Sequence, residues 1–283
     1  MEETVIDREA EGIAKSIGIP PCPAILTGLI AQMRNDEPDF PKIAKLIGAD
    51  VALAATMLKT VNSPFYGLRQ KINSIQQALA LLGLRNVSHL ITRLLLQQAF
   101  PVAHGPAMER YWESSSKIAL ILAWLARETR ALDRDEAYTY GLFRDCGIPI
   151  LMLNFDEHAR LLELAARDPE HVLSEIELDH LGLDHTSVGA ELAESWHLSP
   201  AACQAIRHHH DYAKLEAGSD LSPQAISMIA LGIIAERLYL EHCGDPLGAE
   251  WVRAGATALN AAGLTENELQ EYGSEIDAVL ANY

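Results

Sequence analysis

The chain has 283 residues, of which 49% are hydrophobic and only 6% are aromatic, and its formal net charge is −17. A surface this acidic repels phosphate backbones and anionic lipid headgroups, so the composition argues against a nucleic acid or a membrane as the main partner. No apolar run approaches the roughly 20 residues of a membrane span, the N-terminus is too acidic for a signal peptide, and the four cysteines are far apart. We therefore expect a cytoplasmic protein with neither a disulfide framework nor a cysteine-based zinc site.

The first hundred residues predict a helical lobe with clear breaks. The proline-rich residues 19–23 form a rigid turn, and residues 36–38 end the helix that follows. Ser74 caps a further helix, which Gly83 ends. Beyond it, apolar residues recur at helical spacing at Val87, Leu90, Ile91, Leu94 and Leu95.

Residues 101–106, which begin and end with proline, are the expected domain boundary. They separate the N-terminal lobe, residues 1–100, from a second helical bundle, residues 107–283. This bundle opens with a one-sided apolar stripe, as a helix packed on a core requires. The stripe consists of Ile118, Ile121, Leu122, Leu125 and Ala126.

The rest of the second bundle is also predicted to be helical. A loop at residues 216–223 precedes a long helix over about residues 224–242, and Thr265 caps a last helix toward the C-terminus. No stretch shows the period-2 alternation of a strand. The expected fold class is therefore all-α, arranged as a two-lobed helical bundle.

Several spaced motifs give the chain a family resemblance. The N-terminal motifs are Ile19-Pro20, Cys22-Pro23, residues 47–50 with Leu53, Asn62-Ser63-Pro64, Tyr66-Gly67, Ser74-Ile75 and residues 78–83. The C-terminal motifs are Glu177, Leu181-Gly182, Asp184-His185, Val188-Gly189, Leu192 and Trp196. In this order and spacing, residues 19–211 resemble the HDOD family, although Val51 replaces the family's usual proline. The remaining C-terminal helices would follow this module.

The resemblance implies an HD-domain-like helical fold, a regulatory output role in bacterial signal transduction, and kinship with HD-superfamily metal phosphohydrolases. Those enzymes hold a metal with histidines and an adjacent His-Asp pair, and the pattern places the first histidine at Ser114 and the pair at Arg144-Asp145. Serine is a poor ligand for a transition metal, and arginine has no lone pair to donate because it stays protonated. We therefore expect that the site is degenerate and that the protein is not an enzyme. In this site Arg144 would stand in for the metal and neutralise Asp145.

His185 and the pair His209-His210 remain with Asp145 as candidate ligands, and His208 lengthens the histidine run. Histidines with a carboxylate can bind zinc, nickel or copper. Histidines at a helix end also form local hydrogen bonds, and we expect no resident metal and no other cofactor. The Gly-Tyr-Pro signature of hydrolases that cleave cyclic di-GMP is absent, since residues 210–214 read His-Asp-Tyr-Ala-Lys.

Two further groups of residues are expected to be structural. Glu175, Glu177 and Asp179 are interpreted as a solvated acidic face of one helix. Trp112 and Trp196 lie at motif positions and are expected to anchor the core.

The sequence thus predicts a non-catalytic signal-transduction module that acts through protein–protein contacts. Its expected partners are signalling proteins, such as components of a two-component or cyclic-dinucleotide pathway. The candidate interaction loop consists of Asn62, Ser63, Pro64, Tyr66 and Gly67. Asn62 and Ser63 can equally well cap the next turn, and the sequence does not choose between these roles.

Two alternatives stay open. A residual metal-dependent phosphohydrolase or cyclic-dinucleotide phosphodiesterase would use Asp145, His185, His209 and His210. A nucleotide-sensing pseudo-enzyme would bind a phosphate through Arg144 and the histidines without cleaving it.

Overall fold

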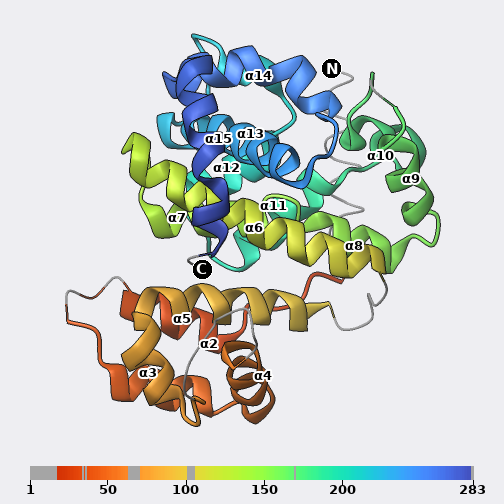
Figure 1. Cartoon of the computed structure of the whole chain (residues 1–283). Helices are drawn as coiled ribbons and strands as arrows, with labels where there is room; N and C mark the ends of the chain where they lie inside the picture. Colours follow the sequence, from red (N-terminus) through yellow and green to blue (C-terminus); the bar gives the residue numbers. More distant parts are fainter. Residues whose placement is uncertain are drawn as a thin grey trace. The chain divides into compact units, whose positions relative to one another are not determined.

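The computed structural model describes residues 18–33, 35, 37–62, 71–100, 106–168 and 170–281. Within these ranges every regular element is a helix and none is a strand, so the predicted all-α fold class is confirmed (Figure 1). The chain divides into two compact units. One is Pro21–Pro101, and the other is Val102–Asn282 together with the segment up to Pro20.

The first unit contains α2 (Ala24–Met33), α3 (Phe40–Gly48), α4 (Val51–Val61) and α5 (Ile75–Ala99). Side chains ahead of three of these helices satisfy the free N–H groups of the first turn. Asp39 accepts from Lys42 N at 2.9 Å, Asp50 from Leu53 N at 2.9 Å, and Ser74 from Gln77 N at 3.1 Å. The apolar faces of these helices form a core that includes Leu29, Ile43, Ile47, Leu53, Met57 and Leu79.

Helix α5 is interrupted at Gly83, where φ is 78° and ψ is 163°. Positive φ costs glycine little, because it has no Cβ to clash. The sequence prediction that Gly83 ends a helix is therefore confirmed at the backbone, although a second helical stretch follows at once. By length and composition α5 is the one helix of the described residues that could cross a membrane, but 56% of its most apolar window is buried in the protein, as in a core helix. The predicted location in the cytoplasm stays a prediction.

Asn62 closes the loop that joins α4 to α5. Its Nδ2 donates to Leu58 O at 2.8 Å and to Ile72 O at 2.7 Å, and its Oδ1 accepts from Ile72 N at 2.8 Å. Asn62 thus ties the two ends of this loop together. The other candidate interaction residues, Ser63, Pro64, Tyr66 and Gly67, lie outside the described residues, and their role stays a prediction.

Replacing Asn62 with alanine is expected to destabilise the first unit by about 1–3 kcal/mol, because three hydrogen bonds are lost and backbone groups lose their partner. Amide hydrogen exchange in α4 and α5 measures this change directly. The exposed Asn73→Ala is the matched control and should leave exchange unchanged. Equal exchange in wild type and Asn62→Ala would show that Asn62 does not brace the loop.

The second unit begins with α6 (Pro106–Thr129) and ends with α15 (Glu266–Ala281). Between them lie α7 (Arg134–Phe143), α8 (Gly147–Asn154), α9 (His158–Ala165), α10 (Leu173–Leu181), α11 (His185–Ser195), α12 (Pro200–His208), the short 3-10 helix η2 (Tyr212–Leu215), α13 (Pro223–Cys243) and α14 (Ala249–Ala262). The predicted long helix is α13. The predicted cap is confirmed, since Thr265 Oγ1 accepts from Glu268 N at 3.3 Å.

The core of the second unit is built around α6 and α13, which pack against each other and against α7 and α14. Trp112 and Trp196 are buried, as predicted, and Trp196 Nε1 donates to Pro20 O at 2.8 Å. Gly147, at the start of α8, lies against the start of α11. A Cβ at this position would come within 2.0 Å of His185 O. Only glycine lets the turn between α7 and α8 approach α11 this closely, and that approach assembles the site described next.

Candidate metal centre

Four side chains that could bind a metal converge in the second unit. They are Asp145, His185, His209 and His210, and one ligand atom from each lies within 4.8 Å of the others. Asp145 Oδ1 is 3.3 Å from His209 Nε2 and 3.6 Å from His185 Nε2, and the two Nε2 atoms are 3.4 Å apart. The sequence selected all four residues, and the structure brings them together.

Helix ends place these four residues. Asp145 lies in the turn between α7 and α8, and His185 is the first residue of α11, whose cap Asp184 accepts from Ser187 N at 2.8 Å. His209 and His210 directly follow α12, and their rings are in contact, tilted by 45° with centroids 4.1 Å apart. Short breaks between helices thus point all four side chains into one space.

Glu177 of α10 holds the main chain and the ring of His185 by hydrogen bonds. Glu177 Oε2 accepts from both His185 N, at 2.8 Å, and His185 Nδ1, at 2.6 Å, while Oε1 accepts from His158 Nε2 at 2.6 Å. The side chains of Glu177 and His158 are 0% exposed. Burial alone would lower the pKa of His185, but the charge of Glu177 and its hydrogen bond raise it to about 9. Likewise, burial would raise the pKa of Glu177, but His185 and His158 lower it to about 2.

The interpretation of Glu177 as part of a solvated face is wrong. Its neighbours Glu175 and Asp179 are exposed, as predicted. Positions two apart on a helix differ by about 200° in direction, so Glu177 points to the opposite side from both of them. The signal that could have identified it was its motif position eight residues before His185.

His209 carries its proton on the side away from Asp145, and Nδ1 of His210 contacts Glu250 and Tyr212. His209 Nδ1 donates to Ile206 O at 2.7 Å, so in the neutral ring the lone pair is on Nε2, which faces Asp145. His210 Nδ1 lies 3.2 Å from Glu250 Oε1 and 3.3 Å from Tyr212 Oη. Burial and nearby positive charge lower the pKa of His209 to about 4 and that of His210 to about 3. Both rings are therefore neutral at pH 7.

Arg144 lies beside this cluster, and most of its guanidinium points away from it. Its Nη2 donates to Glu236 of α13 and, at 3.1 Å, to Glu250 of α14, and its Nη1 donates to Gly232 O at 3.3 Å. Only Nε approaches Asp145, with 3.5 Å to Oδ2. The guanidinium therefore compensates three carboxylates, two of which the sequence analysis missed.

The charges of this network shift the titration of its members. Burial would raise the pKa of Asp145, but the positive charges of Arg144 and His185 hold it well below its ordinary value. Burial, with the adjacent Glu250, raises the pKa of Glu236 to about 7 even though Arg144 lowers it. The phenol of Tyr140 is also buried in this region without a hydrogen-bond partner among the described residues.

Ser114, the remaining predicted site residue, is half-buried on α6. Its hydroxyl donates to Tyr111 O at 3.0 Å, on its own helix. It is not one of the four residues that cluster.

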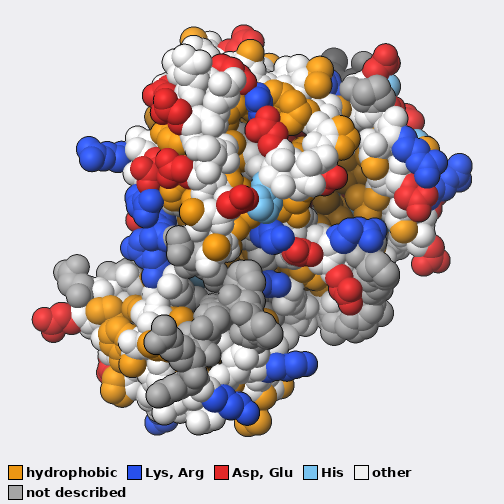
Figure 2. Space-filling view, in the orientation of Figure 1, with side chains coloured by type: hydrophobic (Ala, Val, Ile, Leu, Met, Phe, Trp, Pro, Cys, Tyr) orange, Lys and Arg blue, Asp and Glu red, His pale blue; other side chains and the backbone are white. Residues whose placement is uncertain are grey.

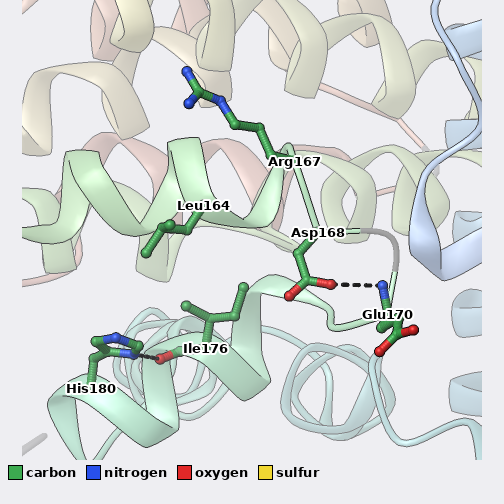
Figure 3. Close-up of a pocket in the computed structure, with 6 residues that line it drawn as sticks. All are labelled: Leu164, Arg167, Asp168, Glu170, Ile176 and His180. Atoms are coloured by element: carbon green, nitrogen blue, oxygen red, sulfur yellow. Dashed lines mark hydrogen bonds between the residues drawn. The ribbon is translucent and has the colours of Figure 1, made fainter.

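Two surface pockets lie elsewhere on the second unit. One, of about 430 Å³, lies between α9 and α10, where Leu164 and Ile176 point into the space and Arg167, Asp168 and Glu170 line its edge (Figure 3). Basic and acidic side chains stand side by side over this region, at the right of Figure 2. The other, of about 520 Å³, is lined by residues of α11 and α12 and of the turn that joins them, including Cys203. No lining residue of either pocket belongs to the four-residue cluster.

Two relatives share part of this sequence. An uncharacterized protein of Treponema pallidum (strain Nichols) is 28% identical over 222 residues, which are 74% of this chain and 41% of that protein. The uncharacterized protein YuxH of Bacillus subtilis (strain 168) is 32% identical over 119 residues, which are 41% of this chain and 28% of that protein. The chain thus spans less than half the length of either relative.

Three solved structures share the fold. An HDOD domain protein of unknown function from Geobacter sulfurreducens has a TM-score of 0.76 at 22% identity, covering 99% of this chain and 97% of that chain. A Marinobacter aquaeolei VT8 protein, provisionally assigned to signal transduction, has a TM-score of 0.75 at 23% identity. The match covers 95% of this chain and 59% of that chain. A Shewanella amazonensis SB2B protein, provisionally assigned as a phosphohydrolase, has a TM-score of 0.68 at 20% identity. The match covers 98% of this chain and 96% of that chain.

At these identities the solved structures establish the fold alone. The family assignment rests on the sequence model of the HDOD domain, which matches residues 19–212, more than half of the chain. The match includes the residues of the four-residue cluster and ends before α13, which supplies Glu236. The chain therefore belongs to the HDOD domain family.

Proposed function

We propose that this protein is a non-catalytic regulatory HDOD module whose polar cluster holds no more than one metal ion. The observation that carries the proposal is the buried guanidinium of Arg144 among Asp145, Glu236 and Glu250. Hydrolysis by two ions needs a second cation that coordinates water and phosphoryl oxygen. A guanidinium supplies the positive charge, but it has no coordination position for water.

The residues of the cluster do fit a single ion. Asp145 Oδ1 and the lone pair of His209 Nε2 face each other at 3.3 Å, and two acceptors this close need a cation or a donated proton between them. Three imidazoles and one carboxylate suit zinc, nickel, copper or ferrous iron. The second ring nitrogen of His185 is bound to a carboxylate and that of His209 to a backbone carbonyl, as in metal sites generally. Such an ion would supply Lewis acidity or structural cross-linking.

Without a metal, His185 supplies the missing positive charge. Its raised pKa, about 9, keeps the ring doubly protonated at neutral pH. Its Nε2 lies within hydrogen-bond distance of His209 Nε2, at 3.4 Å, and its positive charge lies 3.6 Å from Asp145 Oδ1, so it compensates both groups. The protein's own residues thus close the cluster by a charged hydrogen-bonded arrangement, in keeping with a regulatory rather than a catalytic role.

Because a metal must displace the proton on His185, its affinity should depend on pH. His209 and His210, with pKa values of about 4 and 3, are already neutral above about pH 5, whereas His185 titrates near 9. One proton is therefore released per ion, and the association constant for Zn²⁺ is expected to rise about tenfold per pH unit up to about pH 9. Chelator competition at several pH values measures this slope. A flat profile would contradict the proposed protonation of His185.

Phosphodiester turnover distinguishes the non-catalytic role from a residual hydrolase. The specific observation that favours a residual hydrolase is the intact set of Asp145, His185, His209 and His210. Untagged protein loaded with Zn²⁺, Mn²⁺ or Fe²⁺ should show no turnover of bis(p-nitrophenyl) phosphate or cyclic dinucleotides above that of Asp145→Asn. Turnover that Asp145→Asn abolishes would overturn the non-catalytic role.

We further propose that the module acts by binding signalling proteins, through the loop that Asn62 closes. Asn62 itself braces the backbone, so Tyr66→Ala is the sharper probe of contact. After crosslinking in the native host, the wild-type protein should be recovered with a partner protein. Tyr66→Ala should be folded but should be recovered without that partner. Equal recovery by both proteins would exclude this loop as the contact surface.

A further inference from the structure

Glu177 connects three helices through one buried carboxylate. It lies on α10, its Oε1 accepts from His158 on α9, and its Oε2 accepts twice from His185 on α11. The three distances are 2.6, 2.8 and 2.6 Å, and the side chains of Glu177 and His158 are 0% exposed. This buried carboxylate therefore has a donor on each oxygen.

We propose that Glu177, anchored by His158, is the positioning residue that fixes the His185 ring in the candidate metal centre. This inference rests on the proposed single-ion site. The main-chain N–H and the ring Nδ1–H of His185 bind the same oxygen, so the ring has little freedom to turn. Its Nε2 is thereby directed toward His209 Nε2 and Asp145 Oδ1, at 3.4 and 3.6 Å.

His158 restricts the rotation of the Glu177 carboxylate. It occupies Oε1 from α9, so the carboxylate cannot rotate without leaving a buried donor unpaired, which costs about 1–3 kcal/mol. The same two helices also contribute Leu164 of α9 and Ile176 and His180 of α10 to the surface pocket of Figure 3. The pair α9–α10 is thus connected to the cluster through His158 and Glu177, although neither residue touches the ion position.

Four variants separate positioning from general stability. Glu177→Gln keeps the size of the side chain but removes its charge, and His158→Phe removes the donor to Oε1. His158→Gln keeps a donor amide and is the conservative rescue. Asp179→Asn makes the same chemical change as Glu177→Gln on the same helix, at a side chain that is 86% exposed. Circular dichroism confirms that each variant is folded before the measurements.

The first readout is the affinity for Zn²⁺, measured by competition with a chromophoric chelator. Loss of an outer-shell partner typically weakens metal binding about 10–100-fold, and we expect this for Glu177→Gln. His158→Phe should weaken binding as well, but by less, because it acts through Glu177. His158→Gln and Asp179→Asn should bind within about threefold of wild type, since both keep the Glu177 contact to His185.

The second readout uses metal-free protein and is independent of the proposed metal site. In ¹⁵N-labelled wild type, the His185 Nδ1 proton should appear as a slowly exchanging, downfield signal because it is held by a buried carboxylate. We expect this signal to be lost or moved upfield in Glu177→Gln and in His158→Phe, and to be retained in Asp179→Asn.

The two readouts separate two kinds of failure. If wild type binds no Zn²⁺ but the His185 signal responds as expected, the single-ion site is wrong and the positioning role stands. If the His185 signal and the Zn²⁺ affinity are both unchanged in Glu177→Gln and His158→Phe, the positioning role is overturned. Should Glu177→Gln fail to fold, the contrast between His158→Phe and His158→Gln decides the question by the same criteria.

Discussion

Replacing Arg144 with methionine is expected to lower the free energy of unfolding by about 3–5 kcal/mol, because removing one member of a buried ion network leaves the other charges uncompensated. Arg144 is only 4% exposed, and three carboxylates from the α7–α8 turn, α13 and α14 surround it. All four tryptophans of the chain, at positions 112, 124, 196 and 251, lie in the second unit. Urea unfolding followed by tryptophan fluorescence therefore reports on the unit that contains Arg144.

The loss should depend on pH in a defined direction. Burial already raises the pKa of Glu236 to about 7, and without Arg144 it would rise further. The uncompensated charge is thus removed by protonation at low pH, so the Arg144→Met deficit should be larger at pH 8 than at pH 6. A deficit that is equal at both values would show that charge compensation is not what Arg144 contributes.

Arg207→Met is the matched control for Arg144→Met. Arg207 also contacts two glutamates, Glu191 and Glu194, but its side chain is 32% exposed. Solvent-exposed pairs of this kind contribute at most about 1 kcal/mol. Combining Arg144→Met with Glu236→Gln and Glu250→Gln should recover part of the lost stability. A similar deficit for Arg207→Met, or no recovery in the triple variant, would contradict the account.

Replacing Gly147 with alanine is expected to destabilise the second unit by at least about 3 kcal/mol, because the new methyl group would meet backbone that cannot move aside cheaply. Its Cβ would lie 2.0 Å from His185 O and 2.8 Å from His185 Cα. The start of α11 must shift away, and His185 shifts with it. We therefore expect weaker Zn²⁺ binding in addition to a lower midpoint of unfolding by tryptophan fluorescence.

Gly273→Ala provides the matched control for Gly147→Ala. Gly273 lies in α15, where an added Cβ would meet Leu238 at an ordinary 3.8 Å. Because alanine is the better helix former, this change should be neutral or stabilising by up to about 1 kcal/mol. A Gly147→Ala protein as stable as wild type, with unchanged Zn²⁺ affinity, would show that the close approach of α8 to α11 is not required.

The fold and five of the six residues of the predicted degenerate site, all but Ser114, could be found from sequence for a physical reason. Helical periodicity and caps are local, so Ser74, Gly83 and Thr265 could each be placed correctly. Asp145 and the histidines lie at helix ends, and the order of the spaced motifs, which include His185, specifies the fold that brings these residues together.

The residues that the sequence analysis missed act over long distances in the chain. Glu236 and Glu250 lie 92 and 106 positions beyond Arg144, in helices outside the matched family segment. A single acidic residue in such a helix has the same local pattern whether it is solvated or paired with a buried arginine. His158 and Glu177 present the same difficulty, since their interaction depends on the packing of α9 against α10 rather than on either helix alone.

The number of metal ions bound at Asp145 separates a single-ion regulatory site from a two-ion hydrolase. A crystal of untagged protein soaked with Zn²⁺ or Mn²⁺ and measured at the metal absorption edge gives one anomalous peak per ion. We expect no more than one peak, among Asp145, His185, His209 and His210, with the Arg144 guanidinium still between Glu236 and Glu250. Two peaks bridged by Asp145, with Arg144 displaced, would contradict it.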